Sequence, residues 1–344
     1  MTGRERVMRA VAHEATDRVP MDYCTRDDVA KRLVDYLGLP DREALYRKLG
    51  VDARRFAVQD ALGKRETLGD GSFRSGWGVV QRPSADGLYV EWLRGPFSEN
   101  PDLDRFAWPG FDCVESVESI ERMIAPHKGE YATIATLNYP FKVCWHMRGM
   151  ENFLCDTLAD EGYAIALWKK AAEYELEKAR RFVKAGGDIV SFSGDIAMQD
   201  RMMVSVGAWR RIDKPIFADM IRKIRELNGD VLIYYHSDGD MEAVLPDLIE
   251  IGVDIINPIQ PESMDVARIK KQYGKRFTLH GTISIQKTLP FGTLEDVRRE
   301  VLDRMALAAE DGGIMLAPAN HVQNDTPLEN VIEIYRTAGS FQYE

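Results

Sequence analysis

The feature that most constrains the fold is a repeated alternation of short apolar runs with longer amphipathic stretches. Eight runs are typical of β-strands: residues 19–24, 52–57, 131–137, 188–193, 231–236, 253–258, 277–281 and 313–318. From residue 131 onward the runs are nearly continuous, as expected for parallel strands buried on both faces. Eight such units favour a closed barrel over a doubly wound sheet, and no G-x-G-x-x-G follows a strand to support the latter. The predicted fold class is therefore α/β, a (β/α)8 TIM barrel.

The stretches between the runs predict helices. These lie at residues 151–185 (as two helices), 208–228, 241–251, 264–273 and 293–310. Thr293 and Asp296 form a carboxylate variant of the capping box at the start of the last one. Glycines in "KAGGD", "EIGVD" and "EDGGI" are typical of helix ends just before a strand.

Residues 58–110 interrupt this alternation with Gly/Ser-rich turns and short alternating pieces such as "WGVVQ" and "GLYVEWL". We interpret them as a β-hairpin insertion after the second strand, between the second and third strands and near the barrel mouth. The chain, residues 1–344, is then expected to be a single barrel domain carrying this insertion.

Charge and cysteine content limit the partners and the compartment. The chain has 45 Lys and Arg against 55 Asp and Glu, a net charge of −10. This balance argues against nucleic-acid binding, which needs clustered basic residues. The four cysteines form no C-x-x-C pair, and neither a signal peptide nor an apolar run of 18 residues is visible. We expect a cytoplasmic protein that does not enter the membrane.

Polar side chains gather where the predicted strands end, which is where catalytic groups lie in this fold. Three of the six histidines are at such ends. The predicted catalytic residues are His236, Asp195 and His280. His321 follows the last strand, and Asp238 follows the strand that ends at His236. The predicted substrate-binding residues are Asn257, Gln260, Asn138, Cys24 and His146, the last in the helix after the third strand.

Each of these residues also has an ordinary structural interpretation. A strand-end histidine such as His236 can belong to a polar turn without chemistry. Asp238 can accept backbone N–H bonds at the start of the next helix, and Asp195 can cap the turn after its strand. Asn257 and Gln260 can satisfy loop backbone around the prolines of "NPIQP". The cysteines are typical of small buried apolar residues, and Asp240 is expected to cap a helix.

Three long segments resemble the uroporphyrinogen decarboxylase superfamily. They are "YYHSDGDMEAVLPDLIEIGVDIINPIQPESMD", "FTLHGTISIQKTLPFGTLEDVRREV" and "GGIMLAPANHVQNDTPLENVIEIY". The resemblance covers nearly all of the chain and is strong over 185–335. It implies a (β/α)8 barrel and one of two activities: decarboxylation of uroporphyrinogen, or methyl transfer that uses a corrinoid protein.

The resemblance favours methyl transfer. True decarboxylases carry an arginine-rich run near the N-terminus that grips the carboxylates of the substrate, whereas this chain has Arg18-Val-Pro20-Met-Asp22 there and only Arg26 nearby. A substrate with eight carboxylates needs several cationic partners.

The thiol-methylating members of the superfamily hold zinc with an H-x-C pair and a later cysteine. Here Asp238 and Asn320 stand at the two cysteine positions, with His321 beside the second. The resemblance therefore implies His236, Asp238 and His321 as the metal ligands, because His, Asp and His can still hold zinc or another divalent metal.

The resemblance thus implies a corrinoid-dependent methyltransferase component. It would act on a small O- or N-methylated substrate, activate the leaving group by metal or acid, use a corrinoid carried by a partner protein, and form a homodimer. A decarboxylase of uroporphyrinogen or of a smaller acid, and a non-catalytic binding barrel, remain open as alternatives.

Overall fold

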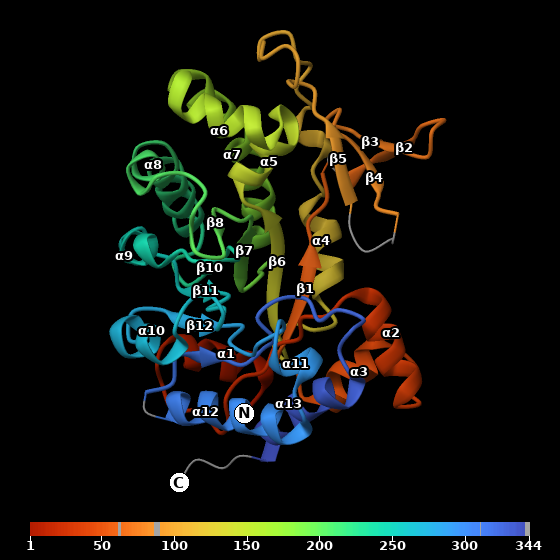
Figure 1. Ribbon diagram of the computed structural model, residues 1–344, viewed down its shortest axis with the longest axis vertical. Helices are drawn as coiled ribbons and strands as arrows, with labels where there is room; N and C mark the ends of the chain where they lie inside the picture. Colours follow the sequence, from red (N-terminus) through yellow and green to blue (C-terminus); the bar gives the residue numbers. More distant parts are fainter. Residues whose placement is uncertain (61–62, 86–89, 310, 341–344) are drawn as a thin grey trace.

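The computed structural model describes residues 1–60, 63–85, 90–309 and 311–340. Its centre is a parallel sheet with strand order β1-β6-β7-β10-β11-β12-β13. The strands are β1 (Ala53–Ala57), β6 (Ala132–Asn138), β7 (Ile189–Ser193), β10 (Leu232–His236), β11 (Ile255–Asn257), β12 (Thr278–His280) and β13 (Ile314–Met315). In Figure 1 the helices surround this sheet on its outer side.

Residues 20–25 close the sheet into a ring between its last and first strands. On one side Asp22 N donates to Leu316 O at 2.9 Å and Leu316 N donates to Pro20 O at 2.8 Å, and on the other side Asp52 N donates to Met21 O at 2.8 Å. Because proline has no N–H, this segment forms isolated bridges and no continuous ladder. The barrel prediction is confirmed, with seven of the eight predicted strands regular and the first reduced to bridges.

The helices follow the predicted alternation closely. They are α1 (Gly3–Val11), α2 (Asp27–Tyr36), α3 (Arg42–Leu49), α4 (Val117–Ile124), α5 (Pro140–Arg148), α6 (Met150–Ala159), α7 (Glu161–Lys184), α8 (Val206–Arg225), α9 (Leu245–Glu250), α10 (Val266–Tyr273), α11 (Thr288–Phe291), α12 (Leu294–Ala309) and α13 (Leu328–Ser340), with 3-10 turns η2 (Phe111–Cys113) and η3 (Glu242–Val244). Among the described residues, none of these helices is long and apolar enough to cross a bilayer.

Two of the helix predictions can be compared in detail. The capping box at the start of α12 is confirmed, since Asp296 N donates to Thr293 Oγ1 at 3.2 Å and Thr293 N donates to Asp296 Oδ2 at 2.9 Å. The predicted helix over 241–251 is wrong in its first half, which forms the short turn η3 before α9 begins at Leu245. Residue 310, the predicted end of α12, lies outside the described residues.

The insertion is a four-stranded antiparallel sheet, larger than the predicted hairpin. Its strands are β2 (Arg65–Thr67), β3 (Phe73–Ser75), β4 (Val80–Pro83) and β5 (Val90–Arg94). The sheet lies beyond the carboxyl end of β1 (Figure 1). Trp92 of β5 donates its Nε1–H to His146 O of α5 at 2.7 Å, so the insertion is attached to α5. That residues 1–344 form one domain, with the insertion near the mouth, stays a prediction.

The interior of the ring is apolar at its amino end. Val7 of α1 packs there against inward side chains of the strands, among them Ala53, Ile134, Tyr234 and Ile255. Because side chains alternate along a strand, the residues two positions further point into the same interior but nearer the carboxyl end. The alternation therefore directs Arg55, His236 and Asn257 into the upper half of the barrel.

A buried carboxylate fixes the amino end of the ring. Asp52 accepts from Arg6 Nη1 at 2.5 Å, from Arg18 Nη1 at 2.7 Å and from Met21 N at 2.8 Å. It thereby ties α1, the closing segment and β1 together.

We expect Asp52→Ala to lower the free energy of unfolding by about 3–5 kcal/mol, because it leaves two guanidinium groups without their buried partner. Equilibrium urea unfolding measures this. Asp17→Ala is the matched control, since Asp17 is a half-exposed partner of the same Arg6, and an exposed pair contributes only about 0–1 kcal/mol. Equal losses in the two variants would contradict a structural role for the buried carboxylate.

Candidate active site

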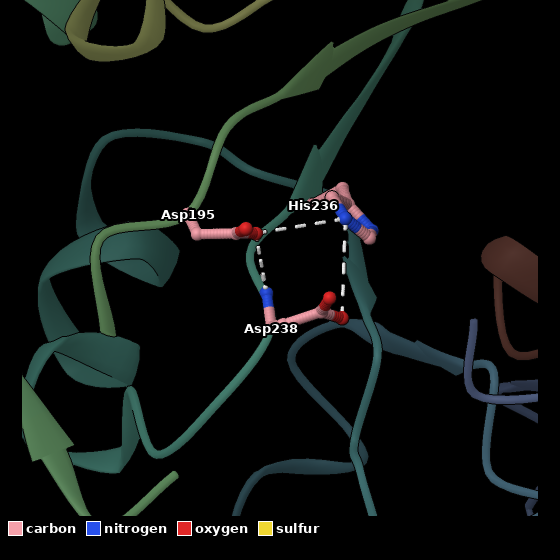
Figure 2. Close-up of side chains that lie close together, drawn as sticks. All are labelled: Asp195, His236 and Asp238. Atoms are coloured by element: carbon pink, nitrogen blue, oxygen red, sulfur yellow. Dashed lines mark hydrogen bonds and ion pairs between the residues drawn. The ribbon is translucent and has the colours of Figure 1, made fainter. Parts of the chain in front are cut away.

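Three side chains converge at the carboxyl ends of β7 and β10 (Figure 2). His236 Nε2 lies 3.7 Å from Asp195 Oδ1 and 4.0 Å from Asp238 Oδ1. The backbone N–H of Asp238 donates to Asp195 Oδ1 at 2.9 Å. One ligand atom from each residue lies within 4.8 Å of the other two. The sequence analysis predicted all three residues for the site.

The loop after β10 turns Asp238 back toward His236. Gly239 has φ +87°, and a Cβ at this position would lie 2.2 Å from Met198 O, so only glycine fits. The next residue, Asp240, donates its N–H to the same oxygen at 2.8 Å. The loop is therefore bound to the short hairpin of β8 (Ala197–Met198) and β9 (Arg201–Met202) that follows β7. Asp240 also accepts from Glu242 N at 3.0 Å, but its predicted role as a helix cap is wrong, because Met241 is the N-cap of η3 and Val244 that of α9, neither with a side-chain cap.

Asp238 has one satisfied and one unsatisfied carboxylate oxygen. Its Oδ2 accepts from Asn320 Nδ2 at 2.5 Å, whereas its buried Oδ1 has no hydrogen-bond partner. Burial raises the pKa of Asp238, the His236 charge opposes that rise, and the neighbouring Asp195 charge adds to it. An unsatisfied buried acceptor is costly, so Oδ1 is a position where a bound cation or donor would be stabilising.

A chain of buried polar side chains runs from His236 to the barrel wall. His236 Nδ1 lies 2.5 Å from Asn257 Oδ1, and Asn257 Nδ2 lies 2.8 Å from His280 Nδ1. His280 Nε2 lies 3.0 Å from Asp22 Oδ2. The same carboxylate oxygen accepts from Arg55 Nη2 at 2.6 Å. His280, Asn257 and Asp22 are all buried.

Arg55 and Asp22, at the far end of this series of hydrogen bonds, determine the charges of its members. Burial alone would raise the pKa of Asp22, but the Arg55 charge and the His280 hydrogen bond outweigh it and hold that pKa below its usual range. Burial also lowers the pKa of His280, which the hydrogen bond to Asp22 partly offsets. Asp22 is therefore a carboxylate and His280 a neutral imidazole at neutral pH.

Arg55 and the role of Asp22 were missed from the sequence. Asp22 was interpreted only as a replacement for a positive residue, yet the structure supplies that positive charge from β1 through Arg55. The available signal was strand alternation: with Ala53 facing inward, an arginine two residues on must also face inward. A charged side chain inside a barrel requires a partner.

The structure places His321 apart from the group of three. His321 is exposed, and its Nδ1 lies 3.1 Å from Asn320 Oδ1. In the described part of the chain, the group with ligand atoms within 4.8 Å contains Asp195 where the predicted metal set had His321. Asn320 reaches Asp238 directly and so supports the site as a hydrogen-bond donor.

The predicted substrate-binding residues divide into two groups. Asn257 belongs to the polar chain, and the Gln260 side chain accepts from Gly239 N at 3.4 Å in the loop beside Asp238. Cys24 is half-buried near Asp22, Arg55 and Asp238, and burial raises the pKa of its thiol to about 12, so the thiol stays protonated.

The other two are not part of the group of three. Asn138, at the end of β6, donates its N–H to buried Glu175 of α7 at 3.0 Å. His146 sits in α5 under the insertion, in edge contact with Trp145, and burial lowers the pKa of its ring to about 3.

A small cavity adjoins the site. Its volume is about 210 Å3, and its lining includes Asp238, Met198, Gln199, Gln260, Gln286 and Asn320. A larger open hollow of about 590 Å3 shares Gln286 and Asn320 with it and adds Arg26 and His321. The two hollows therefore meet at the amide side chains of Gln286 and Asn320, beside Asp238.

The three site residues fit a divalent metal. Zinc binds imidazole nitrogen and carboxylate oxygen at about 2.0–2.2 Å, so two ligand atoms up to roughly 4 Å apart can share one ion. The two distances from His236 Nε2 to the carboxylates, 3.7 and 4.0 Å, meet this condition, and all three ligand atoms lie within 4.8 Å of one another. Imidazole and carboxylate form a harder ligand set than one with thiolates.

Comparisons with known proteins agree with this fold. The family model described as uroporphyrinogen decarboxylase (URO-D) matches residues 96–341. A methylated-thiol–coenzyme M methyltransferase of Methanosarcina mazei is 23% identical over 295 residues, which cover 84% of this chain and 72% of that protein. A solved structure of a methyltransferase from Methanosarcina mazei has a TM-score of 0.74 at 20% identity and covers 99% of both chains.

We expect the metal-free protein to bind one zinc ion, and Asp238→Asn to weaken binding by at least 10-fold because it removes one anionic ligand. Isothermal titration calorimetry measures both affinities. Asp240→Asn makes the same chemical change two residues away, outside the group of three, and is expected to bind like the wild type. Unchanged binding by the Asp238 variant would rule out that carboxylate as a ligand.

Proposed function

The chain belongs to the uroporphyrinogen decarboxylase family, and from that premise we propose that it is a methyltransferase. Its substrate would be a small O- or N-methylated compound, and its second substrate a cobalt corrinoid carried by a separate protein. The observation that carries the proposal is the convergence of His236 with the carboxylates of Asp195 and Asp238 beside a small cavity.

The cavity supports methyl transfer over uroporphyrinogen decarboxylation. A substrate with eight carboxylates requires several cationic side chains. No lysine or arginine is among the described residues that line the 210 Å3 cavity. The nearby Arg55 is paired with Asp22 in the barrel wall. The two similar proteins named above are both methyltransferases, which also favours this activity.

The ligand set favours an oxygen or nitrogen leaving group. A thiolate at the metal would require cysteine near Asp238, and the nearest predicted candidate, Cys24, has a thiol whose pKa is raised by burial to about 12. Asp195, His236 and Asp238 offer imidazole nitrogen and carboxylate oxygen instead. Such hard ligands suit an ion that polarises oxygen or nitrogen.

The chemistry requires help at the leaving atom. When the methyl group passes to cobalt, the carbon–oxygen or carbon–nitrogen bond breaks and its electron pair stays on the heteroatom. That atom is a poor leaving group unless a proton or a cation neutralises it. A divalent ion held by Asp195, His236 and Asp238 would supply Lewis-acid stabilisation of the departing atom.

The chain's own residues position the two carboxylates and line the cavity. Asn320 holds Asp238 through Oδ2, and the Asp238 N–H holds Asp195, so both carboxylates face the imidazole. The side-chain amides of Gln199 and Gln286 line the cavity and are placed to bond a polar substituent of the substrate. Met198, which also lines it, gives the methyl group an apolar contact.

The activity is tested by mixing the zinc-loaded protein with chemically reduced cob(I)alamin and, separately, methanol, a methoxyphenol and trimethylamine. We expect the Co(I) absorbance to fall and that of methylcobalamin to rise with at least one of the three. Asp238→Asn is expected to slow this rate by at least about 100-fold, the scale on which acid or metal activation operates.

Asp240→Asn serves as the matched control and is expected to keep the wild-type rate. Failure of all three methyl donors, together with release of carbon dioxide from uroporphyrinogen, would contradict the proposal and favour decarboxylation. Equal rates for the two aspartate variants would separate the activity from the group of three.

A further inference from the structure

The hydrogen bonds that link His236 to Asp22 all run in one donor-to-acceptor direction, because Asp22, at the far end, can only accept. Asp22 is an ionised carboxylate held by Arg55, so its Oδ2 has no proton to donate. His280 Nε2 lies 3.0 Å from that oxygen, so Nε2 must carry the proton. In a neutral imidazole the other nitrogen is then an acceptor, which leaves Nδ1 of His280 with a lone pair.

Asn257 carries this donor-to-acceptor direction from His280 to His236. The lone pair on His280 Nδ1 needs a donor, and Asn257 Nδ2 is 2.8 Å away. The hydroxyl of Tyr234, at 3.2 Å, also meets this nitrogen and can donate to it. With its NH2 turned to His280, Asn257 presents its oxygen to His236 Nδ1 at 2.5 Å. His236 must therefore carry its proton on Nδ1.

Packing keeps the amide of Asn257 in this place. Gly281 has φ +67°, and a Cβ there would lie 2.3 Å from Asn257 Nδ2. A side chain at this position would displace the amide from His280. Asn257 is itself buried at the end of β11, between β10 and β12.

We propose that Asp22, acting through His280 and Asn257, is a positioning residue that fixes the tautomer of His236 and aims its Nε2 lone pair at Asp195 and Asp238. A free histidine side chain prefers the proton on Nε2, which would place an N–H where a metal ligand is needed. The hydrogen bonds from Asp22 through His280 and Asn257 reverse that preference. Hydrogen bonds behind a ligating histidine fix its tautomer and orientation in the same way in metal sites generally.

The assignment of protons rests on the geometry of these hydrogen bonds together with an ionised Asp22 and a neutral His280. Only its consequence for metal binding rests on the proposed function. The two histidines are 44 residues apart in sequence, and Asp22 is far from both. A change at Asp22 is therefore predicted to alter the chemistry of an imidazole that it does not touch.

The tautomers are measured by 15N NMR of the full-length, metal-free protein labelled at its six histidines, with His236→Gln and His280→Gln used to assign the signals. Two-bond proton–nitrogen correlations distinguish the forms. We expect Nδ1–H for His236 and Nε2–H for His280. An Nε2–H form of His236 in the wild type would overturn the proposal, whatever the activity of the protein.

The double variant Asp22→Asn, Arg55→Met tests the donor-to-acceptor direction of these hydrogen bonds. Asp22 Oδ1 accepts from Tyr23 N at 2.8 Å, so the new amide would keep its oxygen there and turn its NH2 to His280. This reverses every bond in the chain. We expect His236 to change to the Nε2–H form and its zinc affinity to fall by about 10–100-fold, the range for losing a partner behind a metal ligand.

Tyr234→Phe is the matched control, because it also removes a buried polar contact of His280 but leaves the chain from Asp22 intact. It should keep the Nδ1–H form of His236 and the wild-type zinc affinity. A double variant that folds and keeps the Nδ1–H form would overturn the proposal. If the double variant does not fold, the wild-type spectrum still decides.

Discussion

Two carboxylates and an imidazole nitrogen held within 4.8 Å of one another are the constraint on which the rest of this site depends. Like charges at that distance repel, and burial of Asp238 adds to the cost, as the rise in the pKa of this carboxyl indicates. The N–H of Asp238 and the amide of Asn320 offset part of this cost. One buried oxygen of Asp238 stays unsatisfied, which is the reason to expect a cation among the three side chains.

The barrel can hold this arrangement of buried charges because its interior is divided into two halves. The amino half is apolar and closed by Val7 of α1, and the ring is tied there by Asp52 and its two arginines. The carboxyl half holds the polar chain from Arg55 to His236. Site residues on strand ends are held more firmly than residues on free loops, and here even the loop after β10 is bound at Met198 O.

Much of this could be predicted from the sequence, because it depends on local pattern. Seven strands and most helices follow from apolar periodicity, and Asp195, His236 and Asp238 follow from their place at strand ends. What could not be predicted depends on contacts between distant segments. Asp22 and Arg55 meet only when the ring closes, and Asp195 lies 3.7 Å from His236 because β7 and β10 are neighbours in the sheet.

Local chemistry also explains the smaller errors. The first predicted strand is reduced to bridges by Pro20, which cannot donate to a neighbour. The insertion was expected to be one hairpin, but its four short strands pair with one another and attach to α5 through Trp92. Strands of three to five residues carry too little periodicity to be counted from sequence.

X-ray absorption at the zinc edge of the zinc-loaded, full-length protein tests the three-residue site most directly, because it reports the ligand atoms themselves. The predicted spectrum has only nitrogen and oxygen neighbours at about 2.0–2.2 Å, with the outer-shell signature of one imidazole. That signature should disappear in His236→Ala. A sulfur neighbour at about 2.3 Å, or a first shell without imidazole, would contradict a site built from Asp195, His236 and Asp238.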